Sequence, residues 1–379
     1  MITLVEHNPL AFEVVERKCQ GHPDTLADGI SEAISRSLCK NYLDECGSIL
    51  HHNVDKVLII AGRSEPRFSG GTILKPPSVV VGGRASRTGR KTVSEIIEDA
   101  TAGHFQKTLR NLHQFQVEPR VEEGAPELAS LIGRGANDTS IGVGFAPLSD
   151  TERLVLDLEE VVRSVPAAGE DIKLMAVRIG DKLTLVVATA MVSRFLSSRE
   201  DYDEAKAAIR EAVIKKARAD YAGVDHVGEV EVLVNCADAG ENIYLTVTGT
   251  SIEMGDDGAT GRGNRGSGLI TPMRPMTMEA IAGKNPVSHV GKIYNVMAQK
   301  AAAEIAELDG VEAAYVTLVS KIGSPISQPL LRSVQISGKA KLPEAPQAMQ
   351  SKIDGILDYW LESTESMTEQ FIEGKLTIY

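Results

Sequence analysis

The sequence predicts an α+β protein in which mixed or antiparallel sheets are covered by helices. Two observations support this class. Helix-like and strand-like segments alternate along the whole chain, and several strand-like segments are joined by short turns. The clearest turn is Gly180-Asp181, between the strand-like residues 173–179 and 183–192, which predicts a hairpin. At 379 residues, the chain is long enough for two or three domains.

The composition is ordinary for a globular protein, with 42% hydrophobic and 24% charged residues. A formal net charge of -12 argues against nucleic acid and anionic membranes as partners. The four cysteines have no metal-binding spacing, so we expect free thiols. Because no signal peptide is apparent and the longest apolar stretch, 183–192, is too short to span a bilayer, we expect a cytoplasmic protein.

The first part of the chain contains three segments with strand patterns and two with helix patterns. Apolar runs predict strands, and apolar residues at helical spacing predict helices. In chain order we expect a strand over 11–15, a helix from 21 to 38, strands over 57–62 and 79–83 joined by a turn-rich connection over 63–71, a helix over 93–112 and a loop over 121–125.

The remainder continues the alternation, apart from a long segment, residues 255–290, that is rich in glycine and proline and lacks a regular period. The other expected elements are a strand over 141–145, a helix over 150–164, the hairpin described above, a helix over 202–219, strands over 230–235 and 243–250, a helix over 293–308, strands over 311–319 and 334–337, and a helix over 349–364.

The stretch Gly21-His22-Pro23-Asp24 places an imidazole and a carboxylate at the start of a helix. Proline suits the first helical turn, and Asp24 is a good N-cap. Apolar residues from 26 to 38 predict one buried face, with Asp24, Asp28 and Glu32 on the opposite face. A helix N-terminus favours anions, and a carboxylate there can hold a hard cation. Taken alone, the stretch is also explained by Asp24 capping the helix and His22 lying in a loop.

The densest cluster of candidate residues is the glycine-rich segment 255–266. It contains a GxGxxG pattern, but Pro272 soon follows and no helix can open there, so a dinucleotide-binding fold is excluded. A glycine loop that approaches a polyphosphate, with charge from Arg262 and Arg265, fits better. Asp256 and Asp257 could meet ribose, adenine or a metal. A solvated surface loop is the alternative.

Further cations are scattered along the chain, at Lys173, Lys284 and Lys292, and a second glycine-rich turn, residues 133–138, ends in a carboxylate. The chain has no P-loop, no HExxH motif and no Ser-His-Asp order. This set of residues suits a reaction whose main difficulty is charge on a polyphosphate, solved by electrostatic stabilisation without a protein nucleophile.

Several motifs resemble those of S-adenosylmethionine synthetases (methionine adenosyltransferases). Gly21-His22-Pro23-Asp24 resembles the first signature of that family, and Gly255-Asp256-Asp257-Gly258 with Thr260-Gly261-Arg262 resembles the second. The resemblance covers nearly the whole chain and is closer to the archaeal-type branch, on the segments 51–53, 82–85, 261–265 and 282–286. It implies that the sulfur of L-methionine attacks C5′ of ATP, and that the released triphosphate is hydrolysed to pyrophosphate and phosphate.

The resemblance also implies roles for individual residues. His22 would donate to the ribose 5′ oxygen or a nearby phosphate, Asp24 would bind Mg²⁺, and Arg262 and Lys284 would hold the triphosphate. Asp138 is the fourth residue expected to take part in catalysis, because it would face the developing sulfonium. The residues expected to bind ATP are Glu16, Gly133, Arg134, Gly135, Ala136, Asn137, Asp138, Asp171, Lys173, Asp256, Arg262, Arg265 and Lys292.

Methionine is expected to contact Asp138 and Asp256, and here the chain departs from the commoner branch of the family. That branch has a glutamate for the methionine amine after the strand over 57–62, where Arg63 follows here. It also has a lysine directly after the His-Pro-Asp triplet, where Thr25 stands. A second metal-binding aspartate is missing near Asn285, so its replacement and a K⁺ site remain open.

By resemblance, the fold consists of three similar units about a pseudo-threefold axis, interleaved along the chain and divided near 1–145, 146–255 and 256–379. Two subunits pack sheet on sheet, with active sites at the dimer interface. A phosphatase without methionine binding, and a silent subunit or nucleotide sensor, are the alternatives to a synthetase. The intact His22, Asp24 and Arg262 argue against the silent subunit.

Overall fold

Three hydrophobic cores organise the chain, and each lies between one sheet and the helices that cover it. The computed structural model describes residues 2–4, 10–126, 132, 135–221, 228–338, 346–376 and 378–379. Within these residues the helices and the mixed sheets confirm the predicted α+β class. No helix in the described part of the chain combines the length and the apolar character needed to cross a membrane.

The first core lies beneath a four-stranded sheet with the order β13-β3-β6-β7. Apolar side chains at alternate positions, such as Val57 and Ile59, point into this core and meet the apolar side of the first helix. The elements are α1 (Pro23–Cys46), β3 (His52–Ile60), β6 (Ser78–Ala85), α2 (Val93–Thr108), β7 (Gln116–Glu122) and β13 (Gly258–Ala259), with a two-stranded ribbon of β4 (Arg63–Arg67) and β5 (Gly70–Lys75) beside them.

The second core lies beneath a sheet with the order β11-β10-β9-β2, and a short strand, β12, also pairs with β10. The predicted hairpin is confirmed, with Gly180 in a left-handed conformation at its turn. The elements are β2 (Phe12–Lys18), α4 (Asp150–Arg163), β9 (Ala168–Ile179), β10 (Lys182–Val192), α5 (Arg199–Asp220), β11 (Glu229–Val234) and β12 (Leu245–Thr246).

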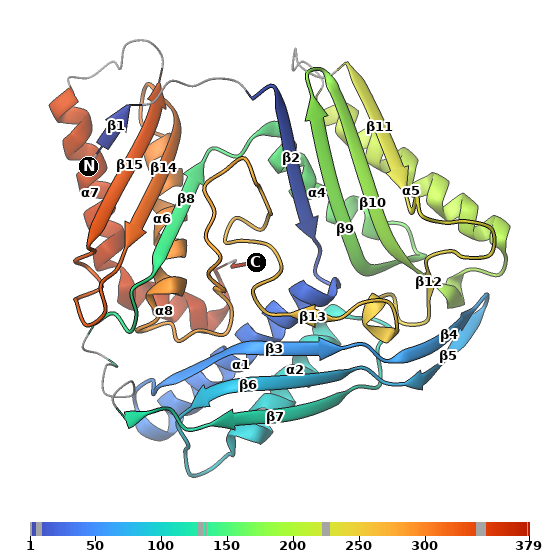
Figure 1. Cartoon of the computed structure of the whole chain (residues 1–379), viewed down its shortest axis with the longest axis horizontal. Coiled ribbons are helices and arrows are strands. Elements are labelled where there is room, and N and C mark those ends of the chain that lie inside the picture. The colour runs from blue at the N-terminus through green and yellow to red at the C-terminus, as the bar shows by residue number, and fades with distance from the viewer. Residues whose placement is uncertain are drawn as a thin grey trace.

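The third core combines strands from distant parts of the sequence in the order β1-β15-β14-β8. Its helices lie at the opposite end of the chain from β1, as Figure 1 shows. The elements are β1 (Ile2–Leu4), β8 (Ile141–Ala146), α6 (Val290–Ala306), β14 (Val311–Val319), β15 (Leu331–Gly338), α7 (Pro346–Glu362) and α8 (Thr364–Glu373).

The irregular segment between β13 and α6 lies in the middle of the molecule, among β2, β8 and β3 (Figure 1). Its residues pair with strands on two sides, since Ile270 exchanges backbone hydrogen bonds with Glu16 of β2 and Val54 of β3 donates to Gly283. The segment therefore joins the three sheets, and its lack of regular structure reflects the several surfaces that it contacts.

The turn-rich connection predicted over 63–71 is instead part of the β4–β5 ribbon. Several predicted elements differ in extent, three of them most clearly. The first helix runs to Cys46, where Gly47 in a left-handed conformation ends it, instead of stopping at residue 38. The helix expected over 93–112 ends at Thr108. The strand expected over 243–250 is mostly wrong, because the Glu253 carboxylate accepts hydrogen bonds from the backbone N–H groups of Val247 and Thr248 and competes with strand pairing.

Asp24, Asp28 and Glu32 were predicted on the face of the first helix opposite its buried apolar face, and that opposite face is buried as well. All three are buried, together with almost every residue of α1 from Pro23 to Ser35. The glycine-rich segment covers the polar side of this helix, and its backbone N–H groups donate to Asp28 and Glu32. The helix is therefore enclosed on both sides.

Candidate active site

His22 is the N-cap of α1, so the prediction that Asp24 caps this helix is wrong. The Nδ1 atom of His22 accepts a hydrogen bond from the backbone N–H of Asp24 at 3.2 Å. Burial lowers the pKa of His22 to about 4; Asp24 opposes this shift, and Lys18 and Lys173 reinforce it. The ring is therefore neutral near pH 7 and carries its proton on Nε2, which becomes a hydrogen-bond donor at the helix mouth.

Asp24 uses its two carboxylate oxygens in different ways. Oδ1 accepts from the backbone N–H of Ala259 at 3.0 Å, which fixes the carboxylate against β13. Oδ2 accepts from the ammonium of Lys18 at 2.8 Å. One oxygen is thus held by the backbone, while the other already attracts a cation.

The glycine-rich segment approaches α1 too closely for side chains. A Cβ on Gly258 would lie only 2.1 Å from the carbonyl oxygen of Pro23. Farther along the helix, the backbone N–H of Gly261 donates to Asp28 at 2.7 Å, and burial raises the pKa of Asp28 to about 7 against the effects of that bond and of Arg265. The glycines therefore serve close contact with α1.

Arg265 is occupied by its own loop. Its guanidinium donates to the carbonyl oxygens of Gly261 and Gly263 at 2.6 and 3.0 Å, and to those of Thr277 and Glu279 at 3.5 and 3.4 Å. These four acceptors fold the segment back on itself. The structure therefore gives Arg265 a role in shaping the loop, and its contact with ATP stays a prediction.

Arg262, Asp256 and Asp257 are exposed at the edge of this loop. Asp257 accepts from the backbone N–H of Ala61 at 2.7 Å, which joins the loop to the end of β3. The carbonyl oxygen of Arg262 accepts from the Lys18 ammonium at 2.8 Å, so Arg262 lies beside the carboxylate of Asp24. Two of the predicted site residues, Arg262 and Asp24, are thus brought together through Lys18.

The start of β9 borders the same site. Asp171 is buried and accepts from the backbone N–H of Ser251 at 2.8 Å and from the hydroxyl of Tyr244 at 3.3 Å, and burial raises the pKa of Asp171 to about 6. Lys173 forms an ion pair with Glu16 at 3.5 Å. Asp171 therefore anchors the loop before β13, while Lys173 and Glu16 remain partly exposed. We call Glu16, His22, Asp24, Lys173 and Arg262 the His22 group.

A second group of charged residues surrounds Lys284. The Lys284 ammonium contacts Glu279 at 2.6 Å and Asp55 at 4.0 Å, and the hydroxyl of Ser140 donates to the other oxygen of Glu279 at 2.8 Å. Two residues before Ser140, Asp138 is exposed. We call Asp55, Asp138, Ser140, Glu279 and Lys284 the Lys284 group.

Neighbouring residues of the 133–138 turn have limited access to a ligand. Gly135 has a positive φ of 142°, and Ala136 is buried. The backbone N–H of Asn137 donates to the carbonyl oxygen of Ser288 at 3.1 Å. Gly133 and Arg134, also predicted to bind ATP, lie outside the described residues.

The two groups lie at different points along α1. The hydroxyl of Ser35 donates to the carbonyl oxygen of Lys284 at 3.2 Å, and Ser35 follows Asp24 by eleven residues. At 1.5 Å per residue, this places the Lys284 backbone about 16 Å along the helix from Asp24. Among the described residues no hydrogen bond or ion pair joins the two groups directly, and the Lys284 backbone lies away from His22 along the helix.

Lys292 does not fit the predicted contact with ATP. Its side chain is fully buried, and its ammonium contacts both carboxylate oxygens of Glu32 at 2.7 Å and the carbonyl oxygen of Lys284 at 3.0 Å. These three acceptors match the three protons of an ammonium. Lys292 therefore stabilises the packing of α6 against α1.

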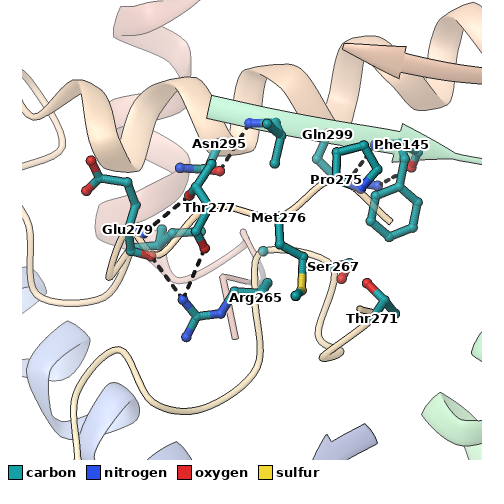
Figure 2. Close-up of a pocket in the computed structure, with 13 residues that line it drawn as sticks. Phe145, Arg265, Ser267, Thr271, Pro275, Met276, Thr277, Glu279, Asn295 and Gln299 are labelled. Atoms are coloured by element: carbon teal, nitrogen blue, oxygen red, sulfur yellow. Dashed lines mark hydrogen bonds between the residues drawn. The ribbon is translucent and has the colours of Figure 1, made fainter. Parts of the chain in front are cut away.

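A small cavity lies between β8, α6 and the loop that holds Arg265, as Figure 2 shows. Its volume of about 20 Å³ is enough for a single water molecule, and the hydroxyls of Ser267 and Thr271 on its wall have no partner within the described structure. The cavity is too small for a nucleotide and is not lined by His22 or Asp24. Its size and its unpartnered hydroxyls suit a single bound water molecule.

Sequence reasoning missed Lys18, Asn264, Asp55 and Glu279. Lys18 reaches Asp24 only because β2 ends beside the helix N-terminus, and Glu279 reaches Lys284 through an irregular loop. A lysine at the end of a predicted strand was a visible signal, but its partner depended on the tertiary fold. For Asp55 and Glu279, the sequence offered no comparable signal.

The two groups of charged side chains suit an enzyme that acts on a highly charged substrate. A family model described as S-adenosylmethionine synthetase (AdoMet synthetase) matches residues 2–375. The chain therefore belongs to the S-adenosylmethionine synthetase family.

Similar proteins named S-adenosylmethionine synthase occur in several archaea. The protein from Methanothrix thermoacetophila is 45% identical over 391 residues, with 97% of this chain and 95% of the relative covered. That from Pyrococcus furiosus is 42% identical over 388 residues, with 97% and 95% covered. That from Methanococcus vannielii is 40% identical over 404 residues, with 100% and 97% covered.

These similarities confirm the resemblance inferred from the motifs and its archaeal-type character. The chain is an enzyme that forms S-adenosylmethionine from ATP and methionine, which favours the synthetase over the phosphatase and silent-subunit alternatives. Enzymes of this family use metal ions.

Proposed function

We propose that the His22 group holds the triphosphate of ATP and stabilises it as it leaves C5′. In this step the bond between the methionine sulfur and C5′ forms, the C5′–O5′ bond breaks, and its electron pair passes to the triphosphate oxygen. A thioether is nucleophilic without losing a proton, so the step needs no general base. The triphosphate is then hydrolysed to pyrophosphate and phosphate before the product leaves.

The neutral ring of His22 is the observation that carries this proposal. Because Nδ1 accepts from the Asp24 backbone, the Nε2–H group is the one that can face a ligand. A neutral imidazole loses its one remaining N–H proton only with difficulty. His22 therefore donates a hydrogen bond to the leaving oxygen and does not transfer its proton to it. A fixed donor aimed at developing charge stabilises the transition state without reorganisation.

Asp24 fits a role in holding Mg²⁺. Its Oδ2 atom faces a cation in the structure, and a hard carboxylate oxygen is the ligand that Mg²⁺ prefers. No cluster of three or more potential metal-binding side chains forms within the described ranges. This agrees with an ion held by one carboxylate together with substrate phosphates and water. Mg²⁺ bound there would neutralise charge on the triphosphate, and K⁺ is a further candidate from the family resemblance alone.

The Lys284 group is proposed to complete the site of a second copy of the chain. Asp138 and Lys284 match the family residues expected to contact methionine and triphosphate. Lys284 lies well away from His22 along α1, and Asp138 lies two residues before Ser140, which contacts Glu279, the partner of Lys284. Packing of two subunits would supply Asp138 from one chain and His22 from the other. This explains the separation of the two groups and makes a homodimer the smallest active form.

A cytoplasmic location is proposed from the cysteines. Cys19 and Cys39 are buried and Cys46 and Cys236 are exposed, and all four are free thiols. Exposed free thiols persist most readily in a reducing compartment.

The test is a single-turnover reaction with ATP, methionine and Mg²⁺, in which S-adenosylmethionine, triphosphate, pyrophosphate and phosphate are measured over time. We expect S-adenosylmethionine to form with equimolar pyrophosphate and phosphate, and triphosphate to appear before its hydrolysis products. Phosphate release that precedes S-adenosylmethionine formation would contradict the proposed order of the two steps.

A further inference from the structure

We propose that Lys18, which no sequence motif singled out, binds the triphosphate in this site. Its ammonium is held by Asp24 and the Arg262 carbonyl before ATP arrives and contacts the phosphate chain when the metal ion and ATP are bound. This inference rests on the proposed role of the His22 group.

The backbone of Lys18 is fixed with unusual completeness. The buried side-chain amide of Asn264 accepts from the Lys18 N–H at 3.0 Å and donates to its carbonyl oxygen at 2.8 Å. The hydroxyl of Thr25 donates to the same carbonyl at 2.8 Å. Three hydrogen bonds from two separate segments thus fix the backbone of Lys18 at the end of β2. Such fixing is expected of a residue that binds a ligand, and a surface lysine does not need it.

The ammonium of Lys18 has a proton left for a ligand. It donates to Asp24 Oδ2 and to the carbonyl oxygen of Arg262, both at 2.8 Å, and an ammonium has three donors. The side chain is 13% exposed, so it is ordered by these contacts but open to solvent on one side. Because it bridges Asp24 and Arg262, any polyphosphate that reaches both of these residues also meets Lys18.

A second lysine lies directly across the sheet. Lys18 of β2 is in register with Lys173 of β9. Like charges directly opposite on neighbouring strands are destabilising unless an anion offsets them. In the structure Asp24 and Glu16 offset these two charges. A triphosphate that reaches both ammonium groups would add its negative charge beside the neutral imidazole donor of His22.

The geometry also accounts for the threonine at position 25, where the commoner branch of the family has lysine. Thr25 lies in the first turn of α1 and contacts Lys18 through its hydroxyl. The strand therefore supplies, next to Asp24, the ammonium that the helix position lacks. A lysine restored at position 25 should be able to replace the one at position 18.

The experiment is titration calorimetry of inorganic tripolyphosphate, with and without Mg²⁺, against four proteins. These are the wild type, Lys18→Met, Lys18→Met combined with Thr25→Lys, and Lys182→Met, a control that removes an ion-paired lysine from the outer part of β10. We expect Lys18→Met to bind at least about ten-fold more weakly. The double variant should recover most of the affinity, and Lys182→Met should match the wild type.

Steady-state kinetics separate binding from a purely structural effect. Lys18→Met should raise KM for ATP with an unchanged KM for methionine, and melting temperatures would report on folding. If Lys18→Met does not fold, Lys18→Gln gives the same test, because its amide can still donate to Asp24. Unchanged tripolyphosphate affinity in the folded variant overturns the inference while leaving the role of His22 intact. Failure of the wild type to bind tripolyphosphate would instead contradict the proposed function.

Discussion

The position of one proton decides what His22 can do. The Asp24 backbone N–H occupies Nδ1, and burial keeps the ring neutral, so Nε2–H is left as a donor. The same residue therefore caps α1 with one nitrogen, and we propose that it serves the reaction with the other. These two functions can be separated by substitution.

We predict that His22→Ala loses both functions and that His22→Asn loses only one. Asparagine is a good N-cap but offers no group at the position of Nε2. Both variants should form S-adenosylmethionine at least about 100-fold more slowly while still binding ATP. Only His22→Ala should lose about 1 kcal/mol of the free energy of unfolding. Measured turnover and urea unfolding check this, and wild-type turnover by His22→Asn would exclude the assigned role.

For Arg262→Ala we predict slower S-adenosylmethionine formation and slower triphosphate hydrolysis. Arg262 is exposed beside Lys18 and Asp24, where its charge would act on the triphosphate in both steps. Each step is followed separately, by rapid quench for the first and by hydrolysis of added tripolyphosphate for the second. If hydrolysis proceeds at the wild-type rate, Arg262 only positions ATP.

At the scale of elements, the site depends on how closely the glycine-rich segment packs against α1. β13 carries Gly258 against Pro23, and its next residue, Ala259, fixes Asp24. A side chain at position 258 would push β13 away from α1. Adding a single methyl group there therefore tests how much the site depends on the packing of β13 against α1.

We predict that Gly258→Ala lowers the melting temperature by several degrees and abolishes most activity, because its Cβ would overlap the Pro23 backbone. Gly103→Ala is the matched control. Gly103 lies inside α2 with no atom near its Cβ position, so this change should stabilise the protein by about 0.5–1 kcal/mol. A neutral effect of Gly258→Ala would show that the two elements can separate without loss.

Most elements could be predicted from local patterns, but their surroundings could not. The hairpin at Gly180 and the buried strands β3 and β6 follow from apolar runs and turn residues. The sequence pattern placed Glu32 on the face opposite the apolar one but did not show that this face would also be buried, where Lys292, 260 residues away, pairs with Glu32. Likewise, Glu253 shortens a predicted strand through contacts that no periodicity encodes.

At the scale of the whole molecule, three sheets with three cores enclose one irregular segment (Figure 1). We propose that they are the three units about a pseudo-threefold axis implied by the family resemblance. Each candidate motif was visible in the sequence, yet their distribution into the His22 group and the Lys284 group depends on which sheet each segment joins.

Buried neutral histidines should make the molecule sensitive to acid. Burial lowers the pKa of His52 to about 3, Lys292 adds to the shift, and a backbone hydrogen bond with Leu50 opposes it. In the unfolded chain the His52 side chain becomes protonated near pH 6.5, whereas in the folded protein it stays neutral to a much lower pH. The free energy of unfolding therefore falls as the pH drops below 6.5.

We predict that His52 alone removes about 2 kcal/mol from the free energy of unfolding between pH 8 and pH 5. Urea unfolding of the wild type and of His52→Gln at both pH values measures this. The wild type should lose more stability than the variant, which has no titrating group at this position. An equal loss in the two proteins would show that His52 does not contribute.

The most direct test of the site proposed between subunits is to mix two inactive variants. His22→Asn and Asp138→Asn subunits would each be inactive alone, because every site in such a homodimer lacks one group. In a mixed dimer, one site would contain both defects and the other would contain neither. After unfolding and refolding together, we predict recovery of about a quarter of wild-type turnover, since half of the dimers would be mixed and each would have one intact site. Mixed dimers that form, as shown by differently tagged subunits, but remain inactive would contradict a site built from two chains.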